Sequence, residues 1–218
     1  NAGDGPTHHG IFDVSFLSAI PQVKIYTPIT FAGLEVSVKK ALAEGVPAAI
    51  RYPNGGEDDL LKATFYPDGE PTDVGVRESN PANPAIPDAV IVTHGRITRE
   101  ALAARERLAT EGILVGILLC EYIKPYEALA EEIAARLPAG VPVLFVEEEI
   151  RAGGFGMMLT DALRRNGGLA GHPNAVLAIA NGFVTQGKNE TILRTAGVDA
   201  EAMVTELKTL LGQPCATP

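Results

Sequence analysis

The second half of the chain alternates short apolar runs with helix-type patterns, and this alternation limits the possible folds more than any other feature. The apolar runs span residues 88–93, 113–120, 141–146 and 175–179, and the helical patterns span residues 98–111, 125–137, 153–165 and 199–211. Such regular alternation indicates a doubly wound, mostly parallel sheet with helices on both faces. The sequence therefore predicts an α/β fold for residues 88–218 and leaves the order of the strands open.

A shorter strand–helix–strand pattern precedes this region. The two strands are expected at residues 23–26 and 47–52, with a helix over residues 31–44 between them. Thr30 can cap the start of the helix and Gly45 can end it. Leu34, Val38 and Leu42 recur at a spacing of four and give the helix one apolar face. The pattern predicts a parallel crossover unit.

Prolines separate the two regions. Pro71, Pro81, Pro84 and Pro87 fall within residues 71–87, together with two asparagines. Such a segment cannot form a helix or a central strand. We therefore predict three parts: residues 1–70, a moderately stiff linker over 71–87, and residues 88–218.

The charge balance excludes several function classes. A formal net charge of -9 argues against a nucleic-acid binder, which needs clustered Lys and Arg. No apolar run reaches the length of a membrane span, and no signal peptide is visible. Cys120 and Cys215 show no metal-type spacing, and Cys120 is expected to be a buried thiol. These features favour a cytoplasmic protein with no metal site of its own.

The segment DGPTHHG at positions 4–10 has the chemistry of a functional loop. His8 and His9 can move protons near neutral pH, and Asp4 adds a carboxylate. The alternative interpretation is a solvated tail with incidental histidines. Because a free terminus should fray, a functional loop at this position suggests a piece of a longer polypeptide.

Other polar side chains follow the predicted strands, where ligands collect in open parallel sheets. Arg51 could bind a phosphate or carboxylate, although a structural ion pair is the favoured interpretation. Glu147-Glu148-Glu149 precedes Gly153-Gly154-Phe155-Gly156, but the order G-x-G-x-x-G of a dinucleotide fingerprint is absent. We expect a structural turn there, with the acidic run capping a helix or meeting a partner. His94, His172 and Lys124 are expected in ordinary loop, turn and helix-start roles.

Together these segments resemble the transketolase superfamily, and within it most of all the C-terminal part of the 1-deoxy-D-xylulose-5-phosphate synthases. The resemblance is carried by DGPTHHG at 4–10, IRYP at 50–53, Lys124-Pro125, and Val146-Glu147-Glu148 leading to Gly153-Gly154-Phe155-Gly156. It implies the rear part of a pyrimidine-binding domain over residues 1–70 and a transketolase C-terminal domain over residues 88–218.

The resemblance also implies an activity. The parent would be a thiamine-diphosphate- and magnesium-dependent transferase that makes 1-deoxy-D-xylulose 5-phosphate and carbon dioxide from pyruvate and glyceraldehyde 3-phosphate, a step toward isoprenoid precursors. His8 and Asp4 match catalytic positions, whereas Arg51, Asn54 and His9 match positions near the substrate. The cofactor's main anchors would lie in missing N-terminal domains. We therefore expect this piece to bind no cofactor and to be inactive alone.

One position departs from the pattern of these synthases. Asn54 stands where they usually have an arginine that helps to hold the acceptor's phosphate. An amide carries no charge, so either other residues bind the phosphate or the acceptor differs.

Three identities stay open. The first is a C-terminal fragment whose C-terminal domain forms a homodimer. The second is a stand-alone pairing subunit of a split transketolase or ketoacid dehydrogenase, and the third is an unrelated doubly wound protein with a small-molecule site. A fragment should expose an apolar patch. We expect it to hide that patch by self-association or to leave residues 1–20 poorly ordered.

Overall fold

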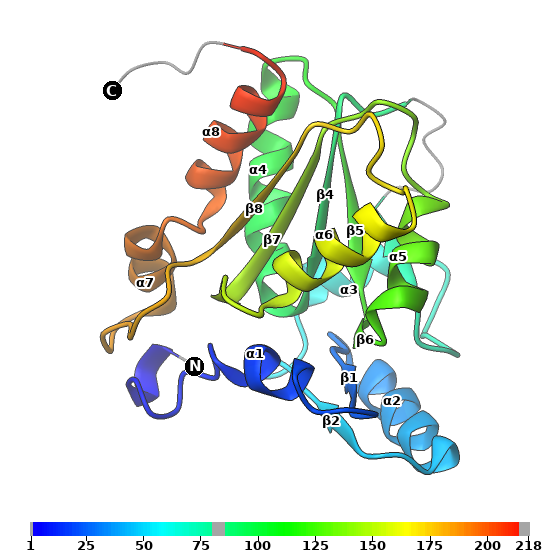
Figure 1. Ribbon diagram of the computed structural model, residues 1–218. Coiled ribbons are helices and arrows are strands. Elements are labelled where there is room, and N and C mark those ends of the chain that lie inside the picture. The colour runs from blue at the N-terminus through cyan, green and yellow to red at the C-terminus, as the bar shows by residue number, and fades with distance from the viewer. Residues whose placement is uncertain (1, 80–85, 214–218) are drawn as a thin grey trace.

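The computed structural model describes residues 2–79 and 86–213, and these residues build two sheets that lie one below the other (Figure 1). The larger sheet contains β3 (Val76–Glu78), β4 (Ala89–His94), β5 (Val115–Cys120), β7 (Val143–Ile150) and β8 (Asn174–Ile179). The smaller sheet contains β1 (Lys24–Tyr26), β2 (Ala48–Ile50) and β6 (Tyr122–Lys124). The helices are α1 (Asp13–Ser18), α2 (Phe31–Glu44), α3 (Asp59–Phe65), α4 (Thr98–Thr110), α5 (Tyr126–Ala134), α6 (Phe155–Arg165), α7 (Asn189–Ala196) and α8 (Ala200–Leu210), with short 3-10 turns η1 (Ala2–Asp4) and η2 (Gly95–Ile97).

The larger sheet has the strand order β3-β5-β4-β7-β8. Its last four strands are parallel, and β3 pairs antiparallel with β5 at the edge. Every residue of β4 is buried, because its side chains alternate between two cores. Ile91 packs in the core that contains α4 and α8, whereas Val90 and Val92 pack in the core that contains α5 and α6. This arrangement confirms the predicted doubly wound sheet.

Local capping signals placed several helix ends correctly. The Thr30 side chain accepts a hydrogen bond from the Gly33 amide at 2.9 Å and caps α2. Gly45 ends α2 in the left-handed conformation, with φ of 63°. Asp199 caps α8 by accepting from the Ala202 amide at 3.1 Å. Side-chain caps of this kind satisfy amide groups that the helix itself leaves unpaired.

The smaller sheet joins the two halves of the chain. β1 and β2 are parallel with α2 between them, as the crossover pattern predicts. β6, which comes from the second half, adds antiparallel to the other edge of β1. The Thr27 amide also donates to the Glu121 carbonyl at 2.7 Å. Main-chain hydrogen bonds therefore connect residues more than ninety positions apart.

The segment 71–87, predicted to be a linker, contributes the edge strand β3. The residues between Pro71 and Pro81 contain no proline, so their amides can pair at a sheet edge. Residues 80–85 lie outside the described part.

The sequence did not predict helices α1, α3 and α7. Residues 2–20 pack against the second half, since the Ile150 amide donates to the Ile11 carbonyl at 3.0 Å. The expectation that the chain self-associates or leaves residues 1–20 poorly ordered stays a prediction.

The apolar face of α2 points away from the described core. Leu42 is 77% exposed, Phe31 is 66% exposed and Val38 is 40% exposed. The residues that α2 buries are the small Gly33 and Ser37. The repeat of Leu34, Val38 and Leu42 thus identified a real apolar stripe, but nothing in the described chain covers most of it.

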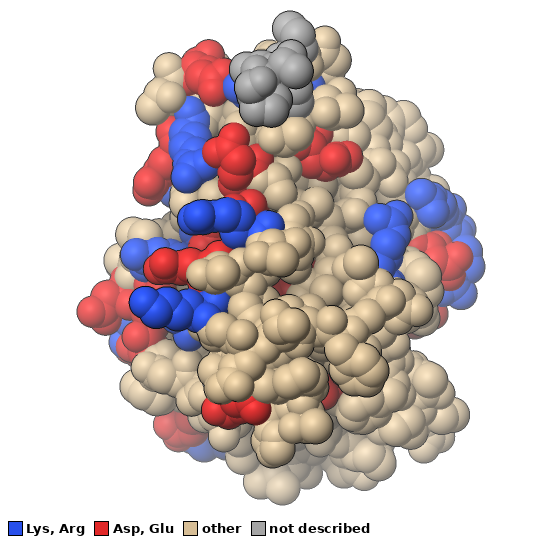
Figure 2. Space-filling view, turned by 90° about the vertical axis from the view of Figure 1, so that its left-hand side faces the viewer, with Lys and Arg blue, Asp and Glu red and all other residues tan. Residues whose placement is uncertain are grey.

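The surface on the side of α7 and α8 shows acidic and basic side chains interspersed, with no continuous basic patch (Figure 2). Among the helices of residues 2–79 and 86–213, none combines the length and apolar character needed to cross a bilayer.

Candidate functional site

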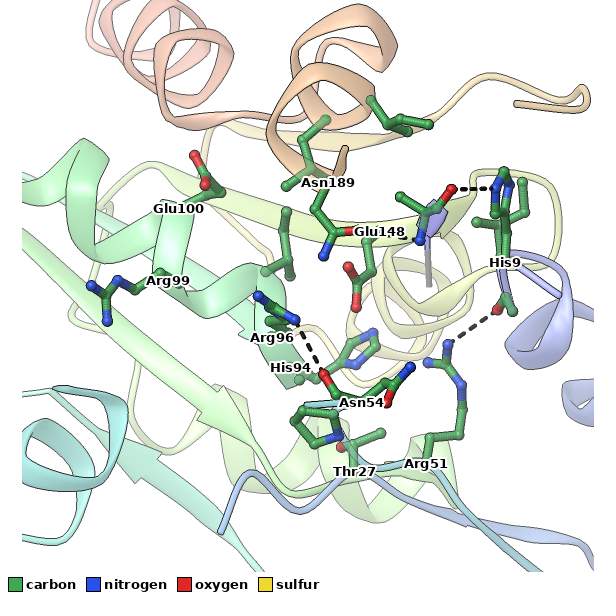
Figure 3. Close-up of a pocket in the computed structure, with 18 of the residues that line it drawn as sticks. His9, Thr27, Arg51, Asn54, His94, Arg96, Arg99, Glu100, Glu148 and Asn189 are labelled. Carbon is green, nitrogen blue, oxygen red and sulfur yellow. Dashed lines mark hydrogen bonds between the residues drawn. The ribbon is translucent and has the colours of Figure 1, made fainter. Parts of the chain in front are cut away.

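A cavity of about 630 Å³ lies where the two halves of the chain meet (Figure 3). It is formed by the opening loop, the residues after β2 and β4, strand β7, and helix α7. The polar side chains that matter most below are His9, Arg51, Asn54, His94, Arg96 and Glu148. The cavity is within the size range of small-molecule sites.

Arg51 ties the opening loop to the larger sheet. Its Nη2 donates to the Gly10 carbonyl at 3.1 Å, and its Nη1 forms a short ion pair with the Glu149 carboxylate. Its Nε lies 3.8 Å from an oxygen of Asp13. The guanidinium is therefore occupied by protein groups. The structural ion pair favoured by the sequence is confirmed, whereas a role in binding substrate stays a prediction.

Glu149 is a fully buried carboxylate between Arg51 and His94. Besides Arg51, it faces His94, whose Nε2 lies 3.2 Å from Glu149 Oε2. Burial alone would raise the pKa of Glu149. The attraction of Arg51 and His94 outweighs burial and holds that pKa below its usual range. The lowered pKa keeps Glu149 ionised at neutral pH, at the centre of the junction.

Glu147 has a different role two residues earlier. Its carboxylate accepts hydrogen bonds from the Phe155 amide at 2.7 Å and the Gly156 amide at 2.9 Å, and so caps the start of α6. Burial, reinforced by the nearby charge of Glu149, raises the pKa of Glu147. The predicted capping role of the acidic run is confirmed for this residue.

The glycines before α6 make this close approach possible. A Cβ on Gly154 would lie 2.3 Å from the Ile150 carbonyl oxygen, and one on Gly156 would lie 2.5 Å from Val176 Cγ1. Both distances are far below normal contact. The glycine-rich turn is thus needed for packing.

The opening loop places its two histidines differently. His8 is exposed, and its Nδ1 lies 2.9 Å from the Thr7 hydroxyl. His9 is buried, with Nε2 at 3.3 Å from the Ala2 carbonyl. Gly5 and Gly10 adopt φ values of 84° and 73°, which favour glycine. The loop therefore presents one imidazole outward and holds the other inward.

The structure brings together three of the five predicted site residues. His9, Arg51 and Asn54 line the cavity, but Asp4 and His8 are not among its lining residues. The catalytic roles of His8 and Asp4 therefore stay predictions. Sequence reasoning gave His94 only an ordinary loop role and missed Arg96. Their one available signal was position, since both come at or just after the end of the predicted strand 88–93.

The other singled-out residues have structural roles. Lys124 Nζ donates to the Ser18 carbonyl at 3.0 Å, and His172 Nδ1 lies 2.8 Å from the Val141 carbonyl. Cys120 is buried, and burial raises the pKa of its thiol. Cys215 lies outside the described residues. Within the described ranges, no group of three or more His, Cys, Asp or Glu is arranged to hold a metal ion.

Comparison with known proteins gives the family. A model of the transketolase C-terminal domain matches residues 83–203, and a model of the transketolase pyrimidine binding domain matches residues 1–56. The 1-deoxy-D-xylulose-5-phosphate synthase of Carboxydothermus hydrogenoformans is 33% identical over 96% of this chain and 32% of its own length. The synthase of Anaeromyxobacter dehalogenans is 34% identical with the same coverage. The chain thus spans about a third of the length of these relatives.

Solved structures agree on the fold. A structure described as an inactive β4 tetramer of a split gene transketolase matches with a TM-score of 0.68 and 24% identity, over 95% of this chain and 63% of that one. Transketolase from Leishmania mexicana matches with a TM-score of 0.63 and 20% identity, over 97% of this chain and 28% of that one. Because the C-terminal-domain model alone matches more than half of its residues, the chain belongs to the transketolase family.

Proposed function

We propose that this chain is the C-terminal part of a thiamine-diphosphate-dependent transferase of the 1-deoxy-D-xylulose-5-phosphate synthase type. The observation that carries the proposal is the 33% identity to a synthase across 96% of this chain. The parent reaction would join pyruvate and glyceraldehyde 3-phosphate, with release of carbon dioxide, in an early step of isoprenoid precursor synthesis.

The exposed face of α2 supports a larger parent. Phe31 and Leu42 are 66% and 77% exposed, and burial of such side chains is worth roughly 1.5–3 kcal/mol each. A contiguous apolar stripe on a soluble domain marks a surface that binds protein. We infer that other domains of the parent cover this face, which would be the remaining part of its pyrimidine-binding domain.

We propose that thiamine diphosphate and Mg²⁺ are held mainly by parts of the parent outside this chain. The cofactor supplies an electron sink when it is bound. His8 is exposed on its loop and can hold or transfer a proton at a substrate oxygen, with Asp4 acting in the same loop.

Asn54 bears on the choice of acceptor. Its side chain offers a neutral amide at the cavity wall, where these synthases usually have a cation. We propose that the acceptor is an aldehyde whose acid group, if it has one, is bound by another arginine.

A second proposal treats the chain as a pairing subunit that receives the cofactor domain from a separate polypeptide. It is favoured by one observation, the likeness to a protein described as the product of a split transketolase gene. Under either proposal we expect a cytoplasmic protein that forms a homodimer through its C-terminal domain.

The test has two steps. Isothermal titration of the chain with thiamine diphosphate and Mg²⁺ should show no binding, and tight binding would contradict the proposal.

The gene should then be expressed with its upstream coding sequence and assayed for carbon dioxide release from pyruvate and glyceraldehyde 3-phosphate. His8→Ala should abolish turnover. The matched control His172→Ala changes a histidine that packs against Val141, away from the cavity, and should retain turnover. If the frame contains no upstream domains, the subunit proposal replaces the fragment proposal.

A further inference from the structure

The cavity lies at the position where parallel sheets most often bind ligands. From β4 the chain passes through α4 to β5 on one side, whereas β7 lies on the other side of β4. The helices that follow β4 and β7 cover opposite faces of the sheet (Figure 1). The carboxyl ends of these two strands therefore open into a crevice at the switch point of the topology. His94 and Arg96, at and just after the end of β4, and Glu148 of β7 line the cavity there.

Arg96 is an arginine of the cavity wall whose guanidinium is not paired with a carboxylate of the described residues. Arg51 is paired with Glu149, and Arg99 makes two hydrogen bonds to Asp58, at 2.8 and 3.0 Å. Arg96 is exposed, and its Nη1 donates to the Asn54 carbonyl at 3.2 Å. Within residues 2–79 and 86–213, it has no carboxylate partner. Because a guanidinium has five N–H donors, Arg96 is held in place with most of its donors free.

Two further polar side chains, His94 and Glu148, lie in the same wall. His94 is 1% exposed, and its Nδ1 has no partner in the part of the chain that the structure describes. Glu148 is half-buried in the same wall, and burial followed by the charge of Glu149 raises the pKa of its carboxyl. Figure 3 shows Arg96, His94 and Glu148 converging above Asn54. A buried polar atom without a partner is costly, so such a group indicates a ligand or ordered water.

We propose that this cavity binds a small acid that also carries hydroxyl groups, with the acid group on Arg96 and hydroxyl groups on Glu148 and His94. A phosphate or carboxylate would receive charge-assisted hydrogen bonds from the guanidinium. A hydroxyl group can donate to a carboxylate and can also accept from or donate to an imidazole nitrogen, whereas an anion without an O–H group can only accept. The proposal deepens the proposed function, because Arg96 would be the arginine that binds the acceptor's acid group, but it uses neither His8 nor the cofactor, and loss of acid binding in the isolated chain would leave the proposed parent reaction untouched.

The test is isothermal titration of the full chain with four probes: glycerol 3-phosphate, glycerate, inorganic phosphate and glycerol. Glycerol 3-phosphate or glycerate should bind at one site, and the tighter of the two identifies the acid group. Inorganic phosphate should bind at least about tenfold more weakly than glycerol 3-phosphate, and glycerol should not bind. Equal binding of phosphate and glycerol 3-phosphate would overturn the role of the hydroxyl groups. If none of the four probes binds at concentrations up to about 20 mM, the proposal is overturned, because a dissociation constant weaker than this is too weak for a specific site.

Variants locate the site. Arg96→Gln should weaken binding roughly 10- to 100-fold, Arg96→Lys less, and Glu148→Gln should reduce the preference for glycerol 3-phosphate over phosphate. The matched control is Arg107→Gln, an exposed arginine on α4 that pairs with Glu201 and does not line the cavity. Arg96→Gln should leave the melting temperature nearly unchanged, because the side chain is exposed. Unchanged affinity in Arg96→Gln, or equal loss in the control, would refute the assignment.

Discussion

Removing the Arg51 guanidinium should destabilise the chain more than removing the Glu149 charge. Glu149 is 0% exposed and Arg51 is 21% exposed in the pair. The Arg51→Met variant leaves a buried carboxylate with the His94 imidazole as its remaining neighbour in the pair. Losing one partner of a buried pair costs about 3–5 kcal/mol, and we expect the lower end because His94 stays at 3.2 Å.

Glu149→Gln should cost less, roughly 1–2 kcal/mol, because an amide oxygen can still accept from Arg51 and the guanidinium keeps its bond to Gly10. Urea unfolding followed by circular dichroism measures both values. If the unfolding free energy falls by roughly 2 kcal/mol per molar urea, a loss of about 3 kcal/mol in that free energy lowers the urea midpoint of unfolding by about 1.5 M. The double variant should cost less than the sum of the single variants by at least about 1 kcal/mol. An Arg51→Met midpoint equal to wild type, or a larger loss in Glu149→Gln, would refute the reasoning.

The same pair gives a pH dependence with a definite sign. The pKa of Glu149 is lower in the folded chain than in the unfolded chain, so its contribution to stability is present above the unfolded value of about 4.3. That contribution is lost as the pH falls toward the lowered folded value. The gap in unfolding free energy between wild type and Glu149→Gln should therefore narrow from about pH 5 to about pH 3, while a constant gap across that range would contradict the assignment.

Three further predictions concern packing and capping. Gly154→Ala should cost about 2–3 kcal/mol in the same urea assay, because its Cβ would lie 2.3 Å from the Ile150 carbonyl oxygen, whereas Gly182→Ala meets nothing within 4 Å and should cost under about 1 kcal/mol. The Cys120 thiol, whose pKa is raised by burial, should resist alkylation at pH 8 until the chain unfolds, as peptide mapping would show. Asp58→Ala should cost about 1–2 kcal/mol because the Asp58 side chain caps α3.

Features that depend on neighbouring residues were predictable from sequence, and features that depend on distant pairing were not. Thr30 caps α2 through an amide three positions away, so its role was visible locally. Strand β6 has three residues and pairs with β1, about a hundred positions earlier, so no local signal marks it. The candidate site divides in the same way. Arg51 could be expected at a strand end, but its ion pair with Glu149 forms across 98 positions.

The exposed stripe on α2 and the cavity lined by Arg96 differ in chemistry, and the difference indicates what each one binds. The stripe on α2 is apolar and open, with Phe31 66% exposed, so burial against another protein segment is the favourable way to cover it. The cavity at the switch point is polar and already enclosed by segments from both halves of the chain. A small acid can reach Arg96 there without displacing those segments. Covering α2 should therefore leave the affinity of the cavity unchanged, which means that the proposal of a larger parent and the proposal of an acid site can fail independently.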